Sequence, residues 1–366
     1  MATTALSSSL TAAFAPMSAR RLLVFGGIAL IAGGMLFGDI FAVFVLHQNG
    51  GRTGETLLAA AQAAAAQDPA GVRAAFTRIG SLLEDRGTKV DTHVHMTDAG
   101  YLALLLALVQ PYVALRQQRK KRLAQLFITG GVLLPVGIFL IHYVGLAYSP
   151  FPVIGWASVL ADSAGALLII ASLGEAWGFW KYLRGTRAES LEPNLAADDS
   201  WAKRALLSGG TVLVLLGFLY GAWYAAFDLY PQEKQETAIL NSLAEQSAAN
   251  NTALMNQSVN DYGGLAGAKA ISIAAHSHAI EFGLLAMLLS FIQPYVYLNE
   301  VWKRRWVLVL LAGSIILPVF VLLELKLGLV AGGIADVGGL LVIIALIGML
   351  VGVLRHSGRL DAGVTQ

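Results

Sequence analysis

Four of the chain's seven histidines form two His-x-His pairs. The first pair is His93 and His95, and the second is His276 and His278, 183 residues further along. Neutral imidazole binds haem iron, copper or zinc, and it exchanges a proton near neutral pH. Both pairs are therefore candidates for cofactor binding or for proton transfer.

The sequence around these pairs also repeats at the same offset. The matching segments are Gln110–Val113 with Gln293–Val296, Lys120–Arg122 with Lys303–Arg305, and Gly34 and Gly38 with Gly217 and Gly221. The paired stretches run from about residue 20 to 180 and from about 203 to 354. Such self-similarity predicts two tandem copies of one structural unit.

The composition is that of an integral membrane protein. Hydrophobic residues make up 56% of the chain and charged residues 13%, against about 25% charged in a typical soluble domain. Eight apolar runs are long enough to span a bilayer: about 22–46, 96–115, 123–147, 153–180, 205–227, 279–298, 306–325 and 328–354. The sequence predicts an all-α membrane protein with eight transmembrane helices, four in each repeat. The net charge of +2 gives no indication of a nucleic-acid partner.

Basic residues cluster on alternate connections between these runs. The positive-inside rule makes that side cytoplasmic, so both termini are expected in the cytoplasm of a bacterial-type inner membrane. The two long polar connections, about 48–92 and 231–272, are then periplasmic. We expect each to form a small cap of short amphipathic helices. Four spans per repeat is an even number, which predicts that both repeats have the same orientation.

These features divide the chain into five parts. They are a cytoplasmic N-terminal segment (1–21), a first repeat (22–186), a cytoplasmic linker (187–202), a second repeat (203–354) and a cytoplasmic tail (355–366).

Further ionisable residues lie in the spans at the same outer level as the histidines. Such residues are costly in a membrane and are candidates for function. His142 is expected to face His95, since two histidines on facing helices can clamp a haem. In the second repeat, Glu324 falls one residue from the position equivalent to His142. It is expected to act with His276 or His278.

The sequence predicts different roles for the other polar residues. Asp162 and Asp336 correspond to one another and are candidate proton relays. Asp39 corresponds to Ala222, so no role common to both repeats is expected for it. His47, at the end of the first run, is expected to be a solvated helix end.

The chain contains no cysteine. This excludes disulfides, iron–sulfur clusters held by thiolates and covalent c-type haem, so a haem would be bound without covalent attachment.

These observations favour a membrane redox protein. In this interpretation the chain is a subunit that binds haem b near the periplasmic face. It exchanges electrons with a quinol or a periplasmic carrier, alone or with other membrane subunits. The expected cofactor ligands are His93, His95, His142, His276 and His278, and the expected metal ligands are His95, His142, His278 and Glu324.

Three alternatives remain open. The histidines could instead hold copper or zinc, for metal handling or metal-dependent catalysis. The chain could be a proton-coupled transporter, or a scaffold subunit without catalysis.

Overall fold

The computed structural model describes residues 18–144, 155–186, 200–224, 227–228 and 230–355, and every regular element among them is helical. The first half contains α2 (Ala19–Phe41), the π-helical turn η1 (Ala42–Leu46), α3 (His47–Ala65), α4 (Pro69–Val109), η2 (Gln110–Tyr112), α5 (Gln117–Val144) and α6 (Trp156–Leu183). The second half contains α7 (Trp201–Tyr224), α8 (Tyr230–Ala248), α9 (Thr252–Ile292), η5 (Gln293–Tyr295), α10 (Glu300–Leu327) and α11 (Leu329–Arg355).

Eight of these helices are long and apolar enough to cross a membrane. They are α2, α4, α5, α6, α7, α9, α10 and α11. By length and composition, the predicted number of spans is confirmed.

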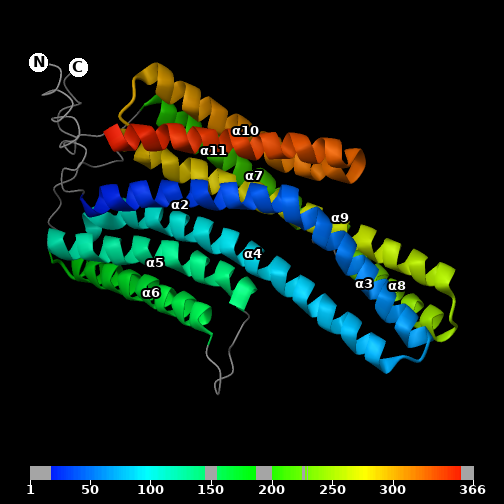
Figure 1. The fold of residues 1–366 in the computed structure, drawn as a ribbon. Helices are drawn as coiled ribbons and strands as arrows, with labels where there is room; N and C mark the ends of the chain where they lie inside the picture. The colour runs from blue at the N-terminus through cyan, green and yellow to red at the C-terminus, as the bar shows by residue number, and fades with distance from the viewer. Residues whose placement is uncertain (1–17, 145–154, 187–199, 225–226, 229, 356–366) are drawn as a thin grey trace, which may run out of the picture.

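The long polar connections form helical hairpins that are continuous with the spans (Figure 1). α4 and α9 each have 41 residues, or about 62 Å of helix, twice the ~30 Å of a bilayer's apolar layer. Asp68 caps the start of α4 and Asn251 caps the start of α9, and no proline interrupts either helix beyond its first turn. The connections are helical, as predicted, but only α3 and α8 are short: in α4 and α9, a polar, helix-forming sequence lets a span continue into water.

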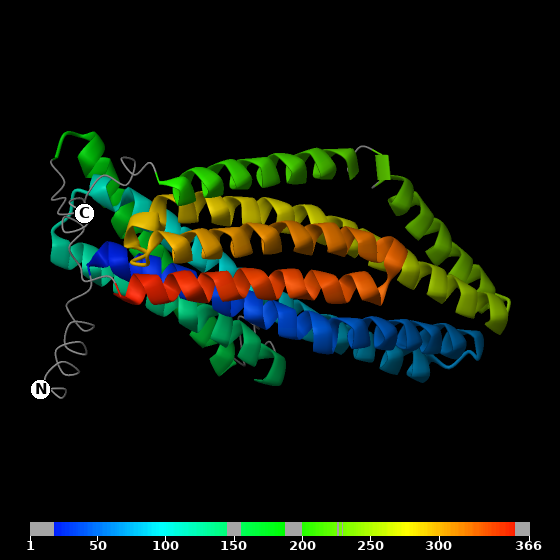
Figure 2. The same ribbon diagram turned by 90° about the horizontal axis from the view of Figure 1, so that it is seen from above.

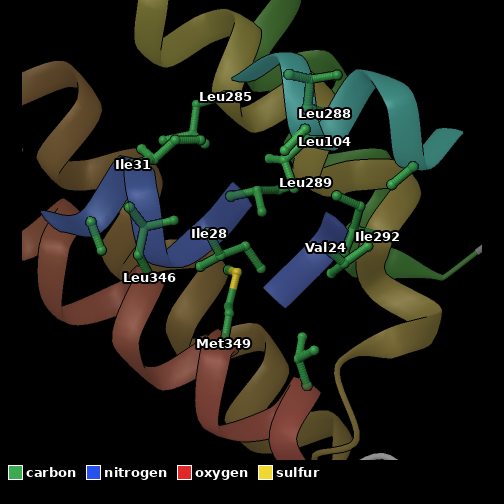
Figure 3. Packing of buried hydrophobic residues seen from close by; sticks show 14 of the residues in the cluster. Val24, Ile28, Ile31, Leu104, Leu285, Leu288, Leu289, Ile292, Leu346 and Met349 are labelled. Carbon is green, nitrogen blue, oxygen red and sulfur yellow. The ribbon is translucent and has the colours of Figure 1, made fainter. Parts of the chain in front are cut away.

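The helices are packed around α2, which contacts helices of both halves. It packs on α4 and α5 of its own half and on α11 of the other half (Figures 1 and 2). Figure 3 shows the buried core that results. Its labelled residues are Val24, Ile28 and Ile31 of α2, Leu104 of α4, Leu285, Leu288, Leu289 and Ile292 of α9, and Leu346 and Met349 of α11. The two halves therefore share one core.

The contacts between the halves are not symmetric. α11 packs on α2, but among the described residues no comparable packing joins α6 to α7, the corresponding pair. As a result, 56% of the apolar window of α2 is buried, against 24% of that of α7. The start of α2 is also fixed to the second half, since Arg20 lies over the ring of Tyr295 and Arg21 donates a hydrogen bond to the carbonyl of Leu354.

Two close helix crossings recur at equivalent glycines. A β-carbon added to Gly100 of α4 would lie 2.8 Å from the carbonyl oxygen of Gly27 of α2. One added to Gly283 of α9 would lie 2.6 Å from the carbonyl oxygen of Gly210 of α7. Only glycine permits such backbone approach between neighbouring helices.

Candidate functional site

The polar residues of interest gather where α2, α4, α9 and α11 meet. We call this group the junction cluster. It consists of Asp39 on α2, His93, His95, Asp98 and Tyr101 on α4, His278 and Glu281 on α9, and Asp336 on α11.

The first His-x-His pair lies within the continuous helix α4. Residues two apart on a helix point about 200° away from each other, so the two rings face different surroundings. His93 is partly buried against Gly38, and its Nδ1 donates a hydrogen bond to the carbonyl of Gly34 over 2.7 Å. His95 is exposed, and its Nδ1 donates to the carbonyl of Asp91 over 2.8 Å.

The second pair repeats part of this arrangement on α9. His276 packs beside Gly221, which corresponds to Gly38, and its Nδ1 donates to the carbonyl of Ser272. His278 lies over the ring of Phe282, with the ring centroids 5.9 Å apart. In each half, the second glycine of the Gly-x-x-x-Gly pattern thus gives space to the first histidine of the pair.

Two carboxylates of the cluster, Asp98 and Glu281, were not among the residues predicted from the sequence. Each lies three residues after the second histidine of its pair, on the same side of the helix. His278 Nδ1 is 3.5 Å from a carboxylate oxygen of Glu281, and Asp98 interacts electrostatically with His95. The 183-residue offset also joins Asp98 to Glu281, so extending the repeated motif to His-x-His-x-x-Asp/Glu would have found both.

The two motifs approach each other between α4 and α9. The hydroxyl of Tyr101 donates a hydrogen bond to the carbonyl of Glu281 over 3.0 Å. His93 interacts electrostatically with His278 and Glu281, and Asp98 interacts with Glu281. All the repeated residues of the two motifs except His276 therefore form one group.

Asp39 extends this group to α11. It interacts electrostatically with Asp336 and with His278. A β-carbon on Gly339 would lie 2.8 Å from Oδ1 of Asp39, so the missing side chain of this glycine leaves space for the carboxylate. Asp39 thus connects the first half to two titratable residues of the second.

The junction cluster covers a range of depths. Asp98 and Glu281 each lie eleven residues before the end of their helix, Val109 or Ile292, which is about 16 Å along the axis. Asp39 lies twenty residues after Ala19, or about 30 Å. Suppose that one surface of the apolar layer lies at Val109, Ile292 and Ala19. The junction cluster then extends from the opposite surface of the layer to near the middle of the layer.

The other residues predicted from the sequence lie elsewhere. Asp162 is exposed on α6, and α6 does not supply a residue to the junction cluster. Glu324 of α10 is partly buried beside Gly332 of α11. The side chains of His47 and His142 lie outside the described part of the structure, so the pairing of His95 with His142 stays a prediction.

Metal binding has no direct support from the described side chains. Among them, no group of three or more histidines, aspartates and glutamates could hold a metal ion. Comparisons with protein-family models, curated proteins and solved structures give no match, so the function must be inferred from the junction cluster itself.

Proposed function

We propose that this chain is a membrane transport protein that moves protons, and that the junction cluster carries them. The observation that carries this proposal is the series of interacting carboxylates and imidazoles on α2, α4, α9 and α11. Together they cover about half the depth of the apolar layer.

The residue types suit repeated proton exchange. Histidine titrates close to neutral pH. Asp98 and Glu281 are exposed near the expected middle of the bilayer, where a charged carboxylate is costly. A carboxylic acid there can release a proton to a neighbouring imidazole, and the carboxylate can accept one in return.

We infer that the two halves are tandem copies with the same orientation, and that the cluster opens to the periplasm. The matching order of helices and the equivalent glycine crossings support the duplication. The basic residues near the start of α2 and the end of α11 support a cytoplasmic location for both termini. The hairpins α3–α4 and α8–α9 then extend into the periplasm of a bacterial-type inner membrane.

Proton uptake by liposomes containing the purified protein tests this function. A potassium gradient with valinomycin supplies the driving potential, and a trapped pH-sensitive dye reports the rate. We expect uptake by the wild type, and a rate at least about tenfold lower when Asp98→Asn and Glu281→Gln are combined, because both central carriers are lost.

Glu300→Gln is the matched control, since Glu300 is an exposed carboxylate at the start of α10, outside the junction cluster. Its rate should equal that of the wild type. Uptake no faster than in empty liposomes, or equal rates in the wild type and the double variant, would contradict the proposal.

A redox function is the second candidate, and the histidine geometry favours it. Nδ1 of His93, His95 and His276 each donates to a backbone carbonyl, which leaves the lone pair of each neutral ring on Nε2. Histidines that ligate metals usually have their second nitrogen held in this way. Haem b, or copper or zinc, would then bind near these rings and exchange electrons with a quinol or a periplasmic carrier.

Absorption spectra of the purified protein test this candidate. It predicts a Soret band that shifts on reduction with dithionite and is lost in His95→Ala. For copper or zinc, it predicts about one bound ion per protein in elemental analysis, again lost in His95→Ala. Protein that proves functional in the liposome assay but holds neither haem nor metal would exclude the redox candidate.

A further inference from the structure

The part of α4 within the hairpin carries an uncovered apolar stripe. Phe76, Leu83, Val90 and Val94 are 58%, 54%, 38% and 39% exposed. Val90 lies nineteen residues before Val109, or about 28 Å, and Phe76 lies further along the same axis. If an apolar layer of about 30 Å begins at Val109, Phe76 and Leu83 lie outside it, where exposure to water is unfavourable, and Val90 lies near its boundary.

The stripe has the spacing of a coiled-coil seam. Phe76, Leu83 and Val90 lie seven residues apart, at the d positions of a heptad, and the a positions are Gly80, Gly87 and Val94. β-carbons added to Gly80 and Gly87 would meet nothing within 4 Å, so this side of the helix is open. Thr88 and Thr92, on the opposite side, are buried within the chain.

The second half covers one position on the equivalent side of α9, whereas Ala266 and Ile273, which correspond to Leu83 and Val90, are exposed there too. Val259 corresponds to Phe76, but it is only 7% exposed and belongs to a small core with Ala61 of α3 and Leu243 of α8. α3 packs on α9, whereas among the described residues no comparable packing joins α8 to α4. The position of Phe76 is thus a packing position that its own chain leaves uncovered.

We propose that a second copy of this chain covers the stripe, and that the two α4 helices form a parallel coiled coil that extends outward from the bilayer. Two copies inserted in the same direction have parallel α4 helices, which places equal heptad positions opposite each other. Arg86 then occupies a g position and Asp91 the following e position. These two positions face each other across a parallel dimer, and both side chains are exposed and of opposite charge.

Single cysteines test the contact directly, because the native chain has none. Under mild oxidation in native membranes, Leu83→Cys and Val90→Cys should each give a disulfide-linked dimer of the chain. Arg78→Cys is the matched control: Arg78 is exposed on the same helix but points away from the seam, so it should stay monomeric.

Charge reversal tests the register of the dimer. Arg86→Glu and Asp91→Arg should each raise the dimer dissociation constant in lipid nanodiscs about fivefold, since each change makes two charge pairs repulsive. Combining them should restore the wild-type value.

Three outcomes would overturn the proposal. One is equal cross-linking at positions 78 and 83, and another is a cross-link to a different protein in place of the dimer. The third is failure of the combined charge reversal to restore association. None of these measurements depends on proton transport.

Discussion

Replacing Gly283 with valine should separate α7 from α9 and destabilise the protein by about 3 kcal/mol or more. The new β-carbon would lie 2.6 Å from the carbonyl oxygen of Gly210 and 2.8 Å from the backbone nitrogen of Val214. Backbone atoms cannot rotate away as a side chain can, so a helix must shift. Chemical unfolding in detergent, followed by tryptophan fluorescence, measures the change in the free energy of unfolding.

Gly165→Val is the control for this prediction. It places the same β-branched residue in the span helix α6, but the β-carbon at Gly165 meets nothing within 4 Å. Both variants share the change in helix propensity from glycine to valine. Apart from that change, the free energy of unfolding of Gly165→Val should stay within about 0.5 kcal/mol of the wild-type value. Equal destabilisation at the two positions would show that the close crossing has no special role.

The spans could be predicted from the sequence because bilayer thickness constrains them. An apolar run of about 20 residues has few alternatives in a membrane, and all eight such runs correspond to helices of the structure. The lengths of α4 and α9 could not be predicted in the same way. Hydropathy marks where a helix leaves the apolar layer, whereas the helix itself begins well outside it, at Pro69 in α4 and at Thr252 in α9.

The candidate site was predicted only in part, for two different reasons. Asp98 and Glu281 were accessible to sequence analysis, since they repeat with the histidines. The position of Asp39 in the site could not be predicted from the sequence. Its counterpart is Ala222, so the repeat gives it no significance, and its contact with α11 depends on packing that α6 and α7 do not reproduce.

This asymmetry has a consequence for how the two halves could differ in function. A duplicated motif on α4 and α9 supplies similar groups from both halves, but Asp39 and Tyr101 come from the first half alone. Tyr101 corresponds to Leu284, which cannot donate a hydrogen bond. The junction cluster therefore combines repeated residues with residues specific to one half, and only the packed structure brings them together.

Replacing Asp336 with asparagine should slow proton uptake by the liposomes at least about tenfold, while Asp162→Asn should leave the rate within about twofold of the wild type. The sequence makes these two aspartates equivalent candidates for a proton relay. In the structure, Asp336 interacts with Asp39 of the junction cluster, whereas Asp162 is exposed on α6. Asparagine keeps the size and polarity of aspartate but cannot release a proton, so folding should be preserved in both variants. Equal loss of uptake in the two variants would show that protons do not enter through the junction of α2 and α11.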